Sequence, residues 1–305
     1  MKNEIGKSAL ALIAAIIWGL AFVAQSESAN KIGFFTFNAI RCIFAFITLL
    51  IVVCIITIIN KKKKKEMKLI NKSVIVGGTI CGILLFIATN LQQYGITHTS
   101  AGKAGFITSL YIVIVPILGI FRHKKLTFNI IISVLLALIG LYFLCISDEF
   151  YISRYDLMIM ACAFIFSFHI ISVDYFSSKV DCIMLSLIQF FVSGVLSTLF
   201  ATTCESIEFS NIKACIWPLL YVGILSSAVA YTLQIIAQKG SNPTTISIIL
   251  SLESVFSVIG GLVILHNLLT LREYFGCALM FIAVIFAQVQ IRFKTNKKAS
   301  PSDDA

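Results

Sequence analysis

The sequence has few charged residues, which limits the kind of fold that it can adopt. Of 305 residues, only 12% are Asp, Glu, Lys or Arg, whereas 59% are hydrophobic. Water-soluble domains carry about 25% charged residues. Because a soluble surface cannot be built from so few polar side chains, the composition excludes a water-soluble globular protein and indicates that most of the chain lies in a lipid bilayer.

The sequence also lacks the short motifs of several enzyme and pump classes. Its nine cysteines form no Cys-x-x-Cys pair, and no His spacing suits zinc. HExxH, GxSxG and the ATP-binding GxxxxGK[ST] motif do not occur. We therefore predict neither an enzyme nor a bound cofactor. An intramembrane enzyme and a channel stay as alternatives, although the charge rings typical of channels are not visible in the sequence.

Basic residues outnumber acidic ones, 24 against 14, which gives a net charge of +10. We do not expect nucleic-acid binding, because cytoplasmic loops of membrane proteins collect Lys and Arg. With the N-terminus inside, 18 basic residues fall in inner segments and 5 in outer ones, which together with Arg41 make the 24. We predict a plasma-membrane protein with both termini cytoplasmic. The lysine run at 61–65 would anchor an inner loop at 61–72, with binding of anionic lipid as the alternative.

Long apolar stretches separated by short polar segments predict ten membrane-spanning helices. A helix needs about 20 apolar residues to cross a bilayer. Runs such as FAFITLLIVVCIITII lack the alternation of a barrel strand. The predicted fold class is an all-α polytopic membrane protein, with spans at 8–25, 34–59, 74–94, 104–120, 128–146, 156–173, 183–203, 212–235, 244–265 and 274–291.

The sequence contains a weak internal repeat. A shift of 148 residues places 38–45 over 186–193, and a shift of 142 places 91–119 over 233–261. Because five spans is an odd number, the second half must enter the membrane from the side opposite to the first. Inverted repeats of this kind are typical of secondary transporters that work by alternating access. We predict two inverted five-helix halves, 1–150 and 151–295, and a polar cytoplasmic tail at 296–305.

Four segments carry a family resemblance: IIWGLAFV, NAIRCIFAF, GITHTSAGKAGFITSLYIVIVPILG and QKGSNPTTISIILSLESVFSVIGG. Together they resemble the EamA family of the drug/metabolite transporter superfamily, over about residues 8–291. The resemblance implies ten helices in two inverted halves, and export or exchange of small metabolites, often amino acids. Two positions depart from the family pattern. Cys42 replaces a common aromatic residue, and Ser254 replaces a proline, which puts a proline-dependent bend after Glu253 in doubt.

Two charged residues inside spans are the main candidates for a binding site. Counted at about 1.5 Å per residue, Glu253 lies roughly 13 Å from one face and Arg41 roughly 12 Å from the other. At this similar depth they could share one cavity. A zwitterionic cargo would place its carboxylate on Arg41 and its amine on Glu253, which could instead carry a coupled proton. A permanent ion pair between the two residues is the rival interpretation.

Further candidates are polar or aromatic residues at helical spacing. Tyr231 and Gln234 follow Ser227 at i+4 and i+7 and continue to Gln238, and Asn90 shares a face with Tyr94. Polar stripes point away from lipid, either into a cavity or onto a neighbouring helix. Trp18 and Tyr111 could stack on a ligand or simply pack. His169 could relay protons or fill the core.

These features together predict a secondary transporter that moves a small metabolite across the plasma membrane, as an exporter or exchanger. The expected partners are a small-molecule substrate and membrane lipid. Coupling to a proton or to a counter-substrate is left open, as are the cargo and the direction of net transport.

Overall fold

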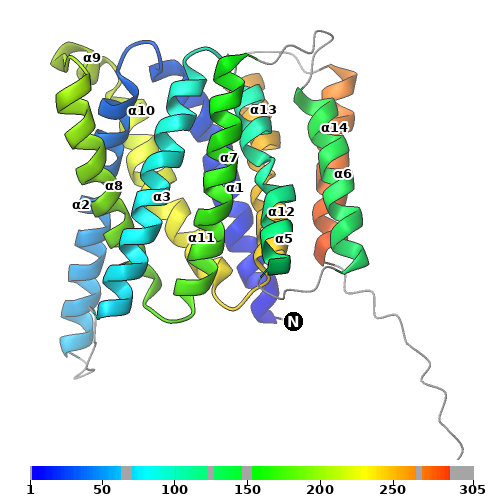
Figure 1. Ribbon diagram of the computed structural model, residues 1–305, viewed down its shortest axis with the longest axis horizontal. Helices are drawn as coiled ribbons and strands as arrows, with labels where there is room; N and C mark the ends of the chain where they lie inside the picture. Colours follow the sequence, from blue (N-terminus) through cyan, green and yellow to red (C-terminus); the bar gives the residue numbers. More distant parts are fainter. Residues whose placement is uncertain are drawn as a thin grey trace, which may run out of the picture.

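The computed structural model is a bundle of helices that run between two ends (Figure 1). It describes residues 2–62, 71–99, 101–121, 127–145, 153–265 and 270–288, and every regular element within these ranges is helical. The helices are α1 (Lys2–Ser28), α2 (Phe34–Lys62), α3 (Lys72–Ile96), α4 (Ala101–Ser109), α5 (Tyr111–Phe121), α6 (Phe128–Cys145), α7 (Arg154–Ser177), α8 (Cys182–Cys204), α9 (Phe209–Ala214), α10 (Ile216–Leu220), the π-helix η1 (Tyr221–Ala230), α11 (Tyr231–Gln238), α12 (Pro243–Leu250), α13 (Glu253–Leu265) and α14 (Leu271–Gln288).

Within the described ranges, eight helical segments are long and apolar enough to cross a membrane. Three of them combine several elements, namely 101–121, 216–238 and 243–264, and two shorter apolar helices lie at 128–143 and 274–287. The prediction of an all-helical membrane fold is therefore confirmed. The predicted tail at 296–305 and most of the predicted loop at 61–72 lie outside the described residues.

Polar residues just ahead of the apolar stretches begin several helices. Asn71 accepts a hydrogen bond of 2.8 Å from the backbone N–H of Val74 at the start of α3. Ser153 and Asp156 form a reciprocal capping box at the start of α7. Asn242 caps α12 directly before Pro243. Proline lacks a backbone N–H, and the first helical position does not require one. These caps satisfy backbone donors that the first helical turn leaves unpaired.

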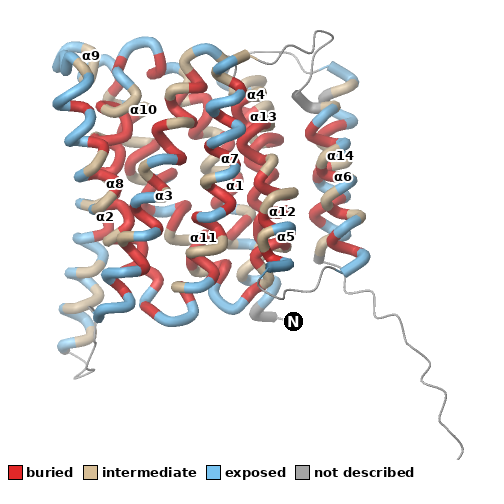
Figure 2. Tube along the Cα trace, in the orientation of Figure 1, coloured by how far each residue is buried: buried red, intermediate tan, exposed pale blue. Residues whose placement is uncertain are grey.

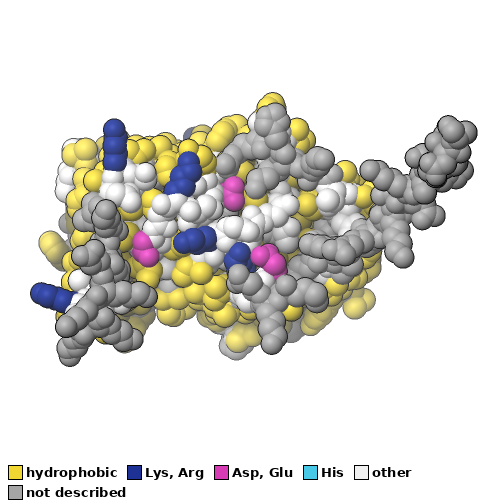
Figure 3. Space-filling model, turned by 90° about the horizontal axis from the view of Figure 1, so that it is seen from below, with side chains coloured by type: hydrophobic (Ala, Val, Ile, Leu, Met, Phe, Trp, Pro, Cys, Tyr) yellow, Lys and Arg dark blue, Asp and Glu magenta, His cyan; other side chains and the backbone are white. Residues whose placement is uncertain are grey.

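Burial divides each long helix into an inner and an outer face (Figure 2). Large apolar side chains are exposed on the outside, such as Ile51 and Val195, as expected for contact with lipid. Seen from the end at which the N-terminus lies, charged side chains gather across the end, and hydrophobic ones surround them (Figure 3). The bundle therefore has an apolar belt and a charged end.

Two predicted continuous spans are interrupted. Helices α4 and α5 meet at Leu110, and α12 ends just before Ser251 and Leu252, after which Glu253 begins α13. Around the second break, the hydroxyls of Ser251 and Ser254 donate to the carbonyls three residues earlier, at 2.8 and 2.7 Å. Serine side chains that bond local carbonyls compete with regular helical bonding, so this helix breaks without a proline.

The packing pairs helices that are distant in sequence. Helix α2 packs mainly on α8, and α6 on α14. The carboxylate of Glu205, just past the end of α8, accepts bonds of 2.9 and 2.8 Å from the backbone N–H groups of Phe35 and Thr36 at the start of α2. Arg272 at the start of α14 lies over the rings of Tyr142 and Phe143 near the end of α6. Both pairs are thus antiparallel.

Candidate functional site

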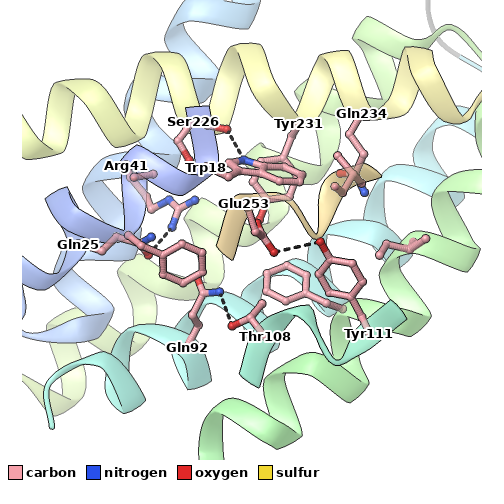
Figure 4. Close-up of a pocket in the computed structure, with 15 residues that line it drawn as sticks. Trp18, Gln25, Arg41, Gln92, Thr108, Tyr111, Ser226, Tyr231, Gln234 and Glu253 are labelled. Atoms are coloured by element: carbon pink, nitrogen blue, oxygen red, sulfur yellow. Dashed lines mark hydrogen bonds between the residues drawn. The ribbon is translucent and has the colours of Figure 1, made fainter. Parts of the chain in front are cut away.

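A cavity of about 40 Å³ lies among α1, α2, α3, α7, η1 and α11, next to the interrupted helices (Figure 4). Since one water needs roughly 10–15 Å³ measured in this way, the cavity has room for about three water molecules. The lining residues are Trp18, Ala21, Phe22, Gln25, Arg41, Gln92, Thr108, Tyr111, Phe166, Ile170, Ser226, Tyr231, Gln234, Leu250 and Glu253.

The helix interruptions place an acid in the cavity wall. Glu253, the first residue of α13, is only 4% exposed, and its Oε1 accepts a hydrogen bond of 3.0 Å from the Tyr111 hydroxyl. Tyr111 is the first residue of α5, so both partners stand directly after a break. Close by, the Ser109 hydroxyl donates to the carbonyl of Ser251 at 3.4 Å. The two interrupted helices are thus joined at their breaks.

A close helix contact fixes the position of Glu253. At Gly19 of α1, an added Cβ would lie 2.3 Å from Cβ of Phe256 and 2.8 Å from the carbonyl oxygen of Glu253. Only glycine permits so close an approach. Next to it in sequence, the Trp18 indole donates to the Ser226 carbonyl at 3.1 Å, and its ring meets Tyr231 edge-on with centroids 4.7 Å apart. Trp18 and Tyr231 therefore form an aromatic wall beside the carboxylate.

A basic side chain of α2 lines the same cavity. Arg41 is 2% exposed, and its Nε donates to the Ser227 hydroxyl at 3.0 Å, while one terminal nitrogen makes a long contact of 3.5 Å with Gln25 Oε1. Ser227 belongs to η1, and π-helical turns occur frequently at functional sites. A guanidinium has five N–H donors. Within the described residues, the donors that remain have no protein acceptor.

Arg41 and Glu253 do not form an ion pair. The ion pairs among the described residues are Lys7 with Glu4, Lys31 with Glu27, and Lys103 with Asp156. In Figure 4 the two cavity charges stand apart, each held by neutral neighbours. The expectation that they share one cavity agrees with their position, whereas the rival interpretation of a permanent pair has no contact to support it. Opposite charges on separate walls can bind a zwitterion between them.

Six of the eight predicted site residues line the cavity: Trp18, Arg41, Tyr111, Tyr231, Gln234 and Glu253. Asn90 and Tyr94 lie elsewhere. The Asn90 amide takes part in bonds with Asn38 and Ser197, and the Tyr94 ring packs against Phe34 and Tyr155. Asn90 and Tyr94 therefore connect neighbouring helices, which is the alternative to lining a cavity for residues on a polar helix face.

Sequence reasoning missed four polar residues of the wall: Gln25, Gln92, Thr108 and Ser226. Gln25 follows Trp18 at i+7, so helical spacing on the first span could have identified it. Gln92 of α3 donates to Thr108 of α4 at 3.2 Å on one side of the cavity (Figure 4), a partnership that depends on tertiary packing. His169 lies outside the wall and contacts Gln189 at 3.1 Å. Among the described residues, no cluster of His, Cys, Asp and Glu could hold a metal ion.

Comparison with known proteins gives the family. The model of the EamA-like transporter family matches residues 7–146 and again 153–288. The chain belongs to the EamA-like transporter family. The resemblance predicted from four short segments is thereby confirmed, and the protein is a multi-pass membrane transporter.

One relative and one structural match accompany this result. An "Uncharacterized transporter" of Archaeoglobus fulgidus is 30% identical to this EamA protein over 283 residues, which cover 92% of this chain and 85% of the relative. A crystal structure matches with a TM-score of 0.75 and 16% identity, covering 92% of this chain and 96% of the other. At that identity the second match shows a shared fold only.

Proposed function

We propose that this protein is a secondary transporter that moves a small zwitterionic metabolite, such as an amino acid, by alternating access. One observation carries the proposal: a buried Arg41 and a buried Glu253 line one cavity without pairing with each other. Unpaired ionisable groups within a membrane are costly, so they mark a binding site by default. The helix breaks beside the cavity are a second feature common in transporters.

The proposed architecture is ten crossings in two inverted halves, 1–150 and 151–295. The packing supports it, because helices at equivalent positions meet each other in antiparallel pairs, α2 with α8 and α6 with α14. The contacts are also reciprocal: α4 packs on α13 as α12 packs on α5. Reciprocal contacts are the signature of a twofold relation. Two matches to one family model, at 7–146 and 153–288, fit the same division.

Two hydrogen bonds give the same indication at the level of single residues. Ser109 bonds Ser251, and Tyr111 bonds Glu253, each pair separated by 142 residues. This separation equals the shift that aligns the two halves of the sequence. Equivalent residues of a twofold repeat touch each other only beside the axis, so the proposed axis passes through the breaks, at the wall of the cavity.

The proposed location is the plasma membrane, with both termini cytoplasmic and net export or exchange as the direction. The excess of Lys and Arg in the predicted inner segments supports this orientation. In the proposed cycle, Arg41 binds the cargo carboxylate through charge-assisted bonds and Glu253 binds its amine or a coupled proton. The cavity then opens to one side at a time, around a site that keeps its place in the membrane.

Transport in proteoliposomes tests the proposal. Vesicles with the purified protein, preloaded with the twenty unlabelled amino acids, are given the same mixture in isotope-labelled form outside. We expect labelled molecules of at least one amino acid to accumulate faster than in protein-free vesicles, driven by exchange. Uptake equal to that of protein-free vesicles contradicts a zwitterion transporter.

The same vesicles separate the competing functions. An intramembrane enzyme would generate new compounds from the mixture, detectable by mass spectrometry, without net accumulation. A channel would let labelled molecules in at a rate that does not depend on the preloaded pool. We expect neither outcome, because an exchanger returns cargo unchanged and responds to the pool on the far side.

A further inference from the structure

We propose that Gln25 binds the cargo carboxylate together with Arg41: its amide oxygen orients the guanidinium, and its amide nitrogen donates a hydrogen bond to the carboxylate. This role rests on the proposed function, because it requires a cargo with a carboxylate. Gln25 lines the cavity and is only 4% exposed. Figure 4 places it beside Arg41, at the end of the cavity away from Tyr111.

Contacts with other helices hold the backbone of Gln25 in place. The amide nitrogen of Gln93 in α3 donates to the Gln25 carbonyl at 3.3 Å. Two turns earlier on the same face of α1, the Trp18 indole donates to the Ser226 carbonyl. The Gln25 side chain therefore starts from a fixed position and reaches Arg41 of α2.

The chemistry of arginine determines how the Gln25 amide is oriented. Arginine carries five N–H donors and no acceptor, so the amide atom that faces Arg41 at 3.5 Å is the oxygen, Oε1. The amide nitrogen, with two N–H donors, points to another side. This nitrogen donates to no residue that the structure describes. Donors without a partner beside a guanidinium favour the binding of an anion.

The distances allow one carboxylate to contact both residues. The oxygen and nitrogen of an amide are about 2.3 Å apart, so Nε2 of Gln25 lies within about 6 Å of the Arg41 nitrogen that Oε1 contacts. A carboxylate oxygen that accepts two bonds of about 2.9 Å can bridge donors up to about 6 Å apart. The contact of 3.5 Å is longer than a usual hydrogen bond, so Gln25 leaves Arg41 able to donate to an anion.

This arrangement gives the cavity a direction. Arg41 and Gln25 supply donors at one end, whereas Glu253 supplies a carboxylate. An amino acid binds with its carboxylate on the donors and its amine on Glu253. An amino-acid carboxamide has the amine but no carboxylate, so it loses the charge-assisted bonds to Arg41 and Gln25. Discrimination between the acid and its carboxamide is therefore the property that Gln25 controls.

Competition between these two analogues tests the role of Gln25. The amino acid that exchanges fastest in proteoliposomes and its carboxamide are compared as inhibitors of exchange, in the wild type, Gln25→Leu and Gln25→Glu. We expect Gln25→Leu to raise the half-inhibiting concentration of the amino acid at least about tenfold, because a hydrogen bond to a charged group is lost. That of the carboxamide should stay nearly unchanged. In Gln25→Glu the carboxamide should inhibit better than the amino acid, because the new carboxylate pairs with Arg41 and repels that of the cargo.

Gln189→Leu is the matched control, since Gln189 is a buried glutamine, 0% exposed, outside the cavity wall. It should keep the wild-type ratio of the two half-inhibiting concentrations. The same ratio in Gln25→Leu overturns the role of Gln25, while exchange by the wild type keeps the proposed function. If Gln25→Leu does not fold, Gln25→Glu decides, and a preference for the amino acid as strong as in the wild type overturns the proposal.

A binding measurement separates this role from transport itself. If the wild type exchanges no amino acid, its melting temperature in detergent is measured with each amino acid and each carboxamide. Stabilisation by an amino acid that Gln25→Leu weakens, and Gln189→Leu does not, would keep the role of Gln25 and reject transport. A wild-type protein that no amino acid stabilises would reject both.

Discussion

Arg41 and Glu253 are the residues on which the chemistry of the cavity depends. Both are buried, and each bonds to neutral groups: Arg41 to Ser227 and Gln25, and Glu253 to Tyr111. Burying a charge without an opposite charge is unfavourable unless a ligand supplies the missing partner. Under the proposed function, a zwitterion would supply both partners at once, which accounts for the separation of the two charges on different walls.

Removing both charges together distinguishes ligand binding from a structural pair. We predict that Arg41→Leu, Glu253→Leu and the double variant each lose amino-acid exchange by at least about tenfold, since a hydrogen bond to a charged group contributes about 1.5–3 kcal/mol. Exchange is measured in proteoliposomes, on variants that remain monodisperse in detergent. A double variant that inserts normally and exchanges at the wild-type rate would refute the binding role.

Residue depth was predictable from sequence, whereas partners across helices were not. Counting residues from the predicted span ends placed Arg41 and Glu253 at similar depth, and both line the cavity. The face of a uniformly apolar helix is harder to assign, because lipid and protein both accept apolar side chains. For that reason Asn90 was expected in the cavity, and Gln92, two residues later on the same helix, was not.

At the scale of elements, the spans were predicted better than their interruptions. The predicted span 34–59 corresponds to α2, Phe34–Lys62, and the span 183–203 to α8, Cys182–Cys204. The break between α12 and α13 contains no proline or glycine from which it could be predicted. It depends on serine hydroxyls that bond to carbonyls of the preceding turn, and serine is common in membrane helices without any break.

The contact between α1 and α13 gives a test of packing. We predict that Gly19→Ala lowers the melting temperature, because the new Cβ would overlap with Phe256 and the backbone of Glu253, and overpacking costs about 1–3 kcal/mol. Gly6→Ala on the same helix is the control, since nothing lies within 4 Å of an added Cβ there. That variant should keep or raise the melting temperature, as alanine favours helix. Equal effects of both substitutions would contradict the close contact.

The ion pair between α4 and α7 gives a second test. The Asp156 side chain is 2% exposed and accepts bonds from Lys103, Thr99 and the Ser153 backbone. We predict that Asp156→Asn destabilises the protein by about 1–3 kcal/mol, because Asp156 is buried and its partners lose a charged acceptor. Glu27→Gln is the control, since Glu27 pairs with Lys31 at the surface and such pairs contribute little. The two melting temperatures are compared in the same detergent, and matching values would exclude a stabilising role of Asp156.

At the scale of the whole molecule, the two ends of the bundle differ while the packing in the middle is reciprocal. Helix α4 packs on α13 as α12 packs on α5, yet the Asp156 to Lys103 ion pair stands at one end of the bundle. An inverted repeat would allow each end of the bundle to adopt the conformation of the other end in turn. The weak repeat was visible in the sequence, but the ion pair at one end depends on contacts between helices that only the fold brings together.

The most direct test of alternating access is labelling of a thiol in the cavity wall from each side of the membrane. In a variant without the native cysteines, Ser226→Cys replaces a wall residue by one of similar size, and Ser167→Cys, 0% exposed and outside the wall, is the control. We predict that an impermeant thiol reagent modifies residue 226 from either side, that the amino-acid mixture slows this reaction, and that residue 167 stays unlabelled. Labelling of residue 226 from one side only, with and without the mixture, would contradict a cavity that opens to both sides in turn.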